Sequence, residues 1–356
     1  MQNNHSLRCS NIELLRIVAM FLVLVAHADF YSLGIPTMQE MQSVPIPSYT
    51  RLFIEALSIV CVNVFVLISG WFGIKASTKG LMNFGFQCLF FLAGIYSVCV
   101  LTGLDTLSIA GVASTLCIGS SGWFIKAYVC LYILAPVLNA FINTACKRQV
   151  QIVLIAFFVF QTIYGWTRST RFFVGGYSAI SFVGLYLLGR YLRVYLQSRC
   201  RALSPRVWLS LYLLCAVLTT TIEIVVAPFS GHFFSLVSPL VIVGAVALLL
   251  AFANMKIRNS RLINRVAASS FAVYLLHNVM GGAAYVFVKR VNDIYASTDG
   301  VMCIIYIGVF LALVFAAAIL IDRIRMLLWR LIVKGVEKIS VRHSLVDKIW
   351  SYKSKI

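Results

Sequence analysis

Long apolar runs recur along the whole chain, and each approaches the length needed to cross a bilayer. A membrane-spanning helix needs about 20 predominantly apolar residues to cover about 30 Å of hydrocarbon. We expect about ten such helices, at 12–32, 52–72, 81–103, 123–144, 150–166, 177–197, 207–227, 233–253, 268–290 and 301–321. The chain is 61% hydrophobic and only 12% charged, which excludes a soluble domain with a polar surface. The sequence therefore predicts an all-α polytopic membrane protein.

The basic residues lie mainly in the short breaks between the apolar runs. An even number of spans places both termini on one side, and the positive-inside rule then favours a cytoplasmic location for both. The net charge of +19 is spread over these breaks, so it does not form the basic face of a nucleic-acid-binding domain. We expect contact with membrane lipids and no nucleic-acid partner.

The breaks between spans are too short for a folded soluble domain. We therefore expect one transmembrane domain over 1–322 and a basic cytoplasmic tail over 323–356. The tail mixes basic and apolar residues at helical spacing, which suits an amphipathic helix on anionic lipid. A plain cytoplasmic retention tail is the alternative. Ten cysteines occur without any CxxC pair, so neither a disulfide framework nor a thiolate metal site is expected.

The first apolar run, NIELLRIVAMFLVLVAHADF at 11–30, contains the ionisable residues Glu13, Arg16 and His27. At about 100° per residue all three fall on one face of a helix, with Arg16 and His27 about 16 Å apart along its axis. Glu13 and Arg16 can neutralise each other. His27 is suited to proton exchange near neutral pH, and ionisable groups inside spans usually mark a functional path. A histidine that only bonds to a neighbouring helix is the alternative.

Residues 1–28 also resemble a cleavable leader peptide. They combine a basic start, an apolar run and an A-x-A triplet at 26–28. Against this interpretation, two charged residues crowd the start of the run, and a membrane bundle follows rather than an exported domain. We therefore expect the segment to be the first span.

At these residues the chain resembles the acyltransferase type 3 family, integral-membrane O-acyltransferases that modify cell-surface glycans. The family's first span carries an acidic residue, two apolar residues and Arg, then ten residues and His, as do Glu13, Arg16 and His27 here. Three further segments occur in family order: a Ser-Gly-aromatic end to span two, a Trp-Phe segment closing with Pro in span four, and a Tyr-apolar-apolar-His element in span nine. The matching residues are Ser69, Gly70, Trp71, Trp123, Phe124, Pro136, Tyr274 and His277.

The resemblance implies acetyl-CoA, or another short acyl-CoA, as a cytoplasmic donor substrate, with no metal. The implied acceptor is a hydroxyl of a cell-surface glycan or its lipid-linked precursor, at the plasma (inner) membrane. His27 would act as general base or as acyl carrier, and Glu13 would orient or neutralise Arg16. Arg16, Lys75 and Lys79 would bind CoA, although family members often carry Arg after span two.

Several further polar and aromatic residues are candidates for lining the site. Asn63 could donate to a developing oxyanion, or simply form an interhelical hydrogen bond. Trp123 could stack on a sugar ring, or belong to the interfacial aromatic belt. We expect Ser69, Tyr274 and His277 to line the site without reacting.

Two acidic residues within the predicted spans have open assignments. Glu55 and Glu223, both near the outer ends of their spans, could orient His27 or face an acceptor channel.

Two other functions use the same buried charges. A transporter or flippase of a small anion or lipid-linked sugar would need them as a substrate path, although no internal repeat of the kind common in transporters is evident. In an assembly subunit of an envelope complex they would only pack against neighbours. The sequence indicates no oligomeric state.

Overall fold

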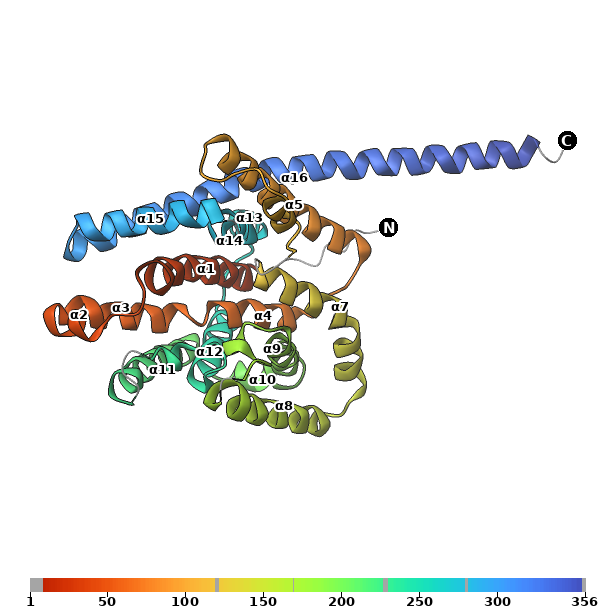
Figure 1. The fold of residues 1–356 in the computed structure, drawn as a ribbon. Coiled ribbons are helices and arrows are strands. Elements are labelled where there is room, and N and C mark those ends of the chain that lie inside the picture. Colours follow the sequence, from red (N-terminus) through yellow and green to blue (C-terminus); the bar gives the residue numbers. More distant parts are fainter. Residues whose placement is uncertain (1–8, 119–121, 169, 227–229, 279–280, 354–356) are drawn as a thin grey trace.

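The computed structural model describes residues 9–353, apart from 119–121, 169, 227–229 and 279–280, and it describes side chains as far as residue 336. Throughout these residues the regular elements are helices, as the sequence predicts (Figure 1). Nine helices of the described chain are long and apolar enough to cross a membrane. The prediction of an all-α polytopic membrane protein is confirmed.

The nine membrane-length helices overlap nine of the predicted spans. The first five are Ser10–Tyr31, Pro45–Phe72, Thr78–Leu101 (α5), Trp123–Thr144 (α7) and Lys147–Thr167. The other four are Ala179–Cys200, Pro205–Val226 (α11), His232–Asn254 and Gly300–Val336, which is the first part of α16 (Gly300–Lys353).

Several of these spans are built from more than one helical segment. Their components are α1 (Ser10–Ala26), η1 (His27–Tyr31), α3 (Pro45–Ser58), α4 (Cys61–Phe72), α8 (Lys147–Gln161), η2 (Thr162–Thr167), α9 (Ala179–Tyr191), η4 (Leu192–Leu196), α10 (Gln197–Cys200), η5 (His232–Phe234) and α12 (Pro239–Asn254). Short helices between the spans are α2 (Met38–Ser43), α6 (Ile109–Thr115), η3 (Val174–Gly176) and α13 (Arg261–Ala268).

The expected span at 268–290 differs from a straight helix. It is divided between α14 (Ser270–Asn278) and α15 (Gly281–Ser297), and the α13–α14 segment makes an angle of 86° with α15. Two consecutive glycines at the start of α15 weaken helical continuity there. The apolar residues predicted where this segment begins and ends, but they did not predict that its helix is broken.

The first helix occupies the centre of the bundle (Figure 1). Leu15 and Ala19 of α1 belong to an apolar cluster shared with α4, α9 and α12, whereas Met20 and Leu24 belong to a second cluster shared with α5, α14 and α16. Cleavage of a leader after residue 28 would remove this helix from both clusters, so we treat residues 10–31 as a span of the folded protein.

Helices α4 and α9 approach each other closely at two glycines. A Cβ on Gly70 would collide with the carbonyl oxygen of Tyr186, and a Cβ on Gly189 would collide with that of Leu67. Small residues allow such close backbone packing between membrane helices. This explains the Ser-Gly-aromatic ending of the second span as a packing element.

The predicted boundary between the membrane domain and the tail lies inside α16. Beyond residue 322 the helix continues, and Arg325 is buried, pairing with Asp322 at 2.8 Å and donating to Asn83 of α5 at 3.0 Å. Most tail side chains lie outside the described residues, so the amphipathic character of 323–356 stays a prediction. Figure 1 places the start of α1 and the end of α16 at the same end of the bundle.

Candidate active site

The first span changes from an α-helix to a π-helix at His27. The π turn η1 runs from His27 to Tyr31, and the hydroxyl of Ser32 donates to the carbonyl oxygen of His27 at 2.6 Å. The rings of His27 and Tyr31, at the two ends of this turn, lie with their centroids 5.4 Å apart. Single π turns inside helices are frequent at functional sites because they redirect side chains.

His27 is hydrogen-bonded to His277, which lies 250 residues away in sequence. The Nδ1 atom of His27 is 2.7 Å from Nε2 of His277, and Nδ1 of His277 is 2.6 Å from the carbonyl oxygen of Val273. A carbonyl only accepts, so Nδ1 of His277 carries a proton. With both rings neutral, Nε2 of His277 then accepts from Nδ1 of His27.

This chain of hydrogen bonds assigns the tautomer of His27. Its Nδ1 carries the proton, so its Nε2 carries the lone pair, and the amide nitrogen of Asn278 lies 3.3 Å from that atom. Both His27 and Asn278 line a large cavity. His277 itself is not among the residues that line this cavity, although the sequence suggested a lining role; its contact is with His27, which it positions.

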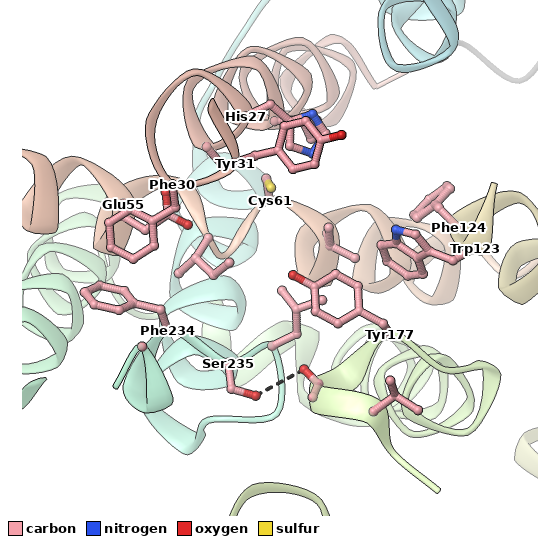
Figure 2. A pocket seen from close by; sticks show the side chains of 18 of the residues that line it. His27, Phe30, Tyr31, Glu55, Cys61, Trp123, Phe124, Tyr177, Phe234 and Ser235 are labelled. Carbon is pink, nitrogen blue, oxygen red and sulfur yellow. Dashed lines mark hydrogen bonds between the residues drawn. The ribbon is translucent and has the colours of Figure 1, made fainter. Parts of the chain in front are cut away.

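The cavity has a volume of about 1120 Å³ and is enclosed by α1, α3, α4, α7, α14 and the loops before α9 and α12. Its walls are largely apolar and include many aromatic rings, and Figure 2 shows Tyr31, Trp123, Tyr177 and Phe234 around the open space. The hydroxyl of Ser235 donates to the carbonyl oxygen of Gly175 at 3.1 Å and joins the two loops (Figure 2). Mostly apolar walls with a few polar groups are typical of small-molecule sites.

A buried ion pair stands beside the π turn. Nε of Arg51 is 2.7 Å from Oδ1 of Asp29, and the guanidinium also donates to the carbonyl oxygen of Gly34. The guanidinium carbon (Cζ) of Arg51 lies 5.6 Å from the ring centroid of Tyr295, a cation–π distance. This pair fixes the end of the first span against α3 and α15.

The two buried glutamates differ in what surrounds them. Glu223 accepts from the backbone amide of Gly231 at 2.6 Å, that of Phe233 at 3.0 Å and the hydroxyl of Ser230 at 3.1 Å. It therefore holds the loop before α12. Glu55 lines the cavity, and its role towards an acceptor stays a prediction.

At the other end of α1, Glu13 and Arg16 pair with each other. Their side chains meet at 2.8 Å, one turn apart; Glu13 is 7% exposed and Arg16 30% exposed. Lys75 lies in the connection between α4 and α5, Lys79 lies in the first turn of α5, and both are exposed. None of these four residues lines the cavity that contains His27.

The remaining candidates separate into two groups. Trp123 and Tyr274 line the cavity with His27. Asn63 is buried and donates to the carbonyl oxygen of Leu236 at 2.9 Å, which is the interhelical alternative; Ser69 donates to the carbonyl oxygen of Phe65 at 3.0 Å. Neither Asn63 nor Ser69 lines the cavity.

Sequence reasoning missed four residues of this region: Tyr31, Asp29, Arg51 and Asn278. Asp29 and Tyr31 follow His27 within one turn, and Asn278 follows His277 directly, so proximity to the two histidines was an available signal. Arg51 offered none, because its contact with Asp29 depends on how α3 packs against η1.

Comparison with known proteins agrees with these features. The model of acyltransferase family 3, described as an acyltransferase domain, matches residues 10–323, nearly the whole chain and all of the residues around the cavity. No curated protein and no solved structure matches the chain significantly. The chain therefore belongs to the acyltransferase 3 family and is a multi-pass membrane acyltransferase.

Proposed function

We propose that the protein transfers an acetyl or other short acyl group from a cytoplasmic acyl-CoA to a hydroxyl of a cell-surface glycan or its lipid-linked precursor. The observation that supports this most is His27, which lines a large cavity rich in aromatic rings and whose Nε2 is left basic by the hydrogen bond between Nδ1 and His277. Such a cavity suits a sugar, which presents apolar ring faces and hydroxyl edges.

In the proposed reaction His27 is the general base. Its Nε2 takes the proton of the acceptor hydroxyl while the hydroxyl oxygen attacks the thioester carbonyl carbon. The tetrahedral intermediate collapses with cleavage of the carbon–sulfur bond, and the departing thiolate recovers the proton from His27. The products are the ester and free CoA.

The same nitrogen also permits a relay. In that route Nε2 attacks the thioester first, CoA leaves, and the acyl-histidine then passes the group to the acceptor hydroxyl. Mass spectrometry of the protein quenched during a single turnover separates the two routes, because only the relay leaves an acyl group on His27.

We assign the donor to the end of the bundle where α1 begins. Arg16, Lys75 and Lys79 supply positive charge there for the phosphates of CoA, with the lysines acting as point charges rather than as bidentate forks. Glu13 sets the position of Arg16 through their ion pair. Donor and acceptor then approach His27 from opposite ends of the bundle.

This assignment requires both termini in the cytoplasm and the cavity facing outward in the plasma membrane. Cys9 and Cys146 are exposed, and the proposed orientation places both on the cytoplasmic side. Variants that keep only one of these cysteines should resist a membrane-impermeant maleimide in intact cells and react after permeabilisation. Labelling in intact cells would show that the protein has the opposite orientation in the membrane.

A transporter or flippase is the second candidate. The break between α14 and α15 beside His277 favours it, since broken helices next to a cavity are common in transporters. Consumption of the thioester distinguishes the two functions, because transport alone releases no CoA.

The decisive experiment measures acetyl-CoA turnover by the purified protein with cell-surface glycan, recording CoA release and glycan acetyl content together. Wild type should show both, and His27→Ala should lose both, by a factor of about 10² to 10⁴, while staying folded and abundant. A fall in abundance alone would favour the assembly-subunit function. Absence of acyl-CoA binding and turnover in wild type would overturn the proposal.

A further inference from the structure

Glu55 brings a carboxyl group with an unfilled hydrogen-bonding position into the cavity. Its side chain is 3% exposed and lines the cavity, and Oε2 has no hydrogen-bond partner among the described residues. Leaving a buried acceptor unmatched costs free energy, so such groups call for a specific explanation.

The neighbouring charges do not supply this missing partner. Arg51, one turn earlier on α3, directs its guanidinium to Asp29 and to the carbonyl oxygen of Gly34. Glu223 shows the contrasting case, because two backbone amides and a hydroxyl surround its carboxylate. Of these two glutamates, only Glu55 lines the cavity and keeps a carboxyl oxygen without a hydrogen-bond partner among the described residues.

The far side of the same cavity is aromatic. Trp123 and Tyr177 pack edge to face with their ring centroids 4.7 Å apart. Figure 2 shows Glu55 on one side of the open space and this aromatic pair on the other. A carboxylate facing aromatic rings fits a ligand with hydroxyl donors on its edge and an apolar face, which describes a sugar ring.

We propose that Glu55 is a specificity residue of the acceptor subsite, where it accepts hydrogen bonds from hydroxyls of the sugar residue that is acylated. The Trp123–Tyr177 pair covers the apolar side of the same sugar. The inference rests on the proposed function, because it names the part of the acceptor that the cavity recognises. It assigns Glu55 to binding, whereas His27 performs the chemistry.

The test compares wild type with Glu55→Gln and Glu55→Asp. Glutamine keeps the size of the side chain but puts an amide group in place of the carboxyl group. Aspartate keeps the carboxyl group but places it one methylene further from the cavity. Glu40→Gln is the control, since Glu40 lies outside the cavity on α2. Size-exclusion profiles and unfolding midpoints in detergent confirm that each variant is folded.

Two readouts are recorded for each variant. The first is steady-state transfer from acetyl-CoA to polysaccharide extracted from the producing cells, which gives KM for each substrate. The second is quenching of tryptophan fluorescence by the same polysaccharide without acetyl-CoA. We expect Glu55→Gln to raise the acceptor KM and the polysaccharide Kd by about tenfold or more, with an unchanged KM for acetyl-CoA. Glu55→Asp should give a smaller increase.

The two readouts separate failure of this inference from failure of the proposed function. Normal transfer and normal polysaccharide binding by a folded Glu55→Gln would overturn the role of Glu55 and leave the acyltransferase proposal intact. Polysaccharide binding that depends on Glu55, in a protein that transfers no acetyl group, would support the subsite and overturn the acetyl-CoA reaction. Equal increases in both KM values would assign Glu55 to general folding.

Discussion

The two ends of the first membrane span stabilise their charged and polar groups in different ways. At the start of α1, Glu13 and Arg16 pair within one helical turn, and Arg16 remains partly exposed. At the other end, His27 depends on His277 of α14, and Asp29 depends on Arg51 of α3.

The difference shows which contacts local spacing determines. A pair at i and i+3 on one helix forms wherever that helix forms. Contacts between helices need the whole bundle, so the far end of the span can hold a histidine in one tautomer next to a cavity. Three sets of variants test this contrast, beginning with the largest expected effect, and a fourth variant tests a helix cap outside the spans.

Arg51→Met, at the end of the span that contains His27, should cause the largest loss of stability. It leaves Asp29 buried without its cation, and removal of one partner of a buried pair costs about 3–5 kcal/mol of stability. Chemical unfolding in detergent measures the loss. The double variant Asp29→Asn/Arg51→Met should recover much of it, because no isolated charge remains. Equal stability of the single variant and wild type would show that the ion pair does not contribute to the free energy of unfolding.

His277→Ala should lower kcat by on the order of tenfold, because His27 loses one hydrogen bond and its fixed tautomer. His277→Gln can place an amide oxygen near the position of Nε2 and should restore part of the rate. The measurement is kcat for acyl transfer, with KM values recorded in parallel. A loss that glutamine does not relieve at all would contradict the hydrogen-bonded positioning of His27.

Changes at the start of α1, where Glu13 and Arg16 pair, should affect binding of the donor instead. Replacing both partners, as Glu13→Gln/Arg16→Gln, removes the positive charge without leaving Glu13 buried and unpaired. We expect a several-fold increase in KM for acetyl-CoA with little change in kcat, measured by CoA release. A collapse of kcat with unchanged KM would place this pair in the chemistry and remove the contrast between the two ends.

The smallest effect concerns a helix cap outside the spans. Hydrogen bonds from the backbone amide and the hydroxyl of Thr37 lower the pKa of the Glu40 carboxyl. A lowered folded-state pKa gives stability that is present above the unfolded value of about 4.3 and is lost as the pH falls through the folded value. Glu40 is partly exposed, so the whole capping box contributes at most about 1 kcal/mol after solvent screening.

Thr37→Ala tests this cap. Its unfolding midpoint should fall slightly below that of wild type at pH 7, and the difference should shrink as the pH drops below about 4. A small part should remain, because the Thr37 hydroxyl also accepts from the backbone amide of Glu40 at 3.3 Å. A difference that is the same at both pH values would show that the Glu40 carboxylate adds nothing to the cap.

The sequence predicted the architecture well because transmembrane helices follow from apolar length alone. It also identified His27, since a histidine inside such a run is costly. The break between α14 and α15 escaped prediction, because hydropathy is insensitive to the direction of a helix. For Asn63 the sequence left two roles open, a donor to an oxyanion or an interhelical hydrogen bond. In the structure its amide donates to the carbonyl oxygen of Leu236.

By itself the sequence determined the membrane class, nine of the spans, the family resemblance and the pairing of Glu13 with Arg16, all of which depend on composition or on residues within a few turns. Only the tertiary structure decided that His277 touches His27, that Arg51 neutralises Asp29, and that Glu55 rather than Glu223 faces the cavity. These contacts join helices distant in sequence. Their geometry is set by helix packing and by the π turn after Ala26, which no local pattern encodes.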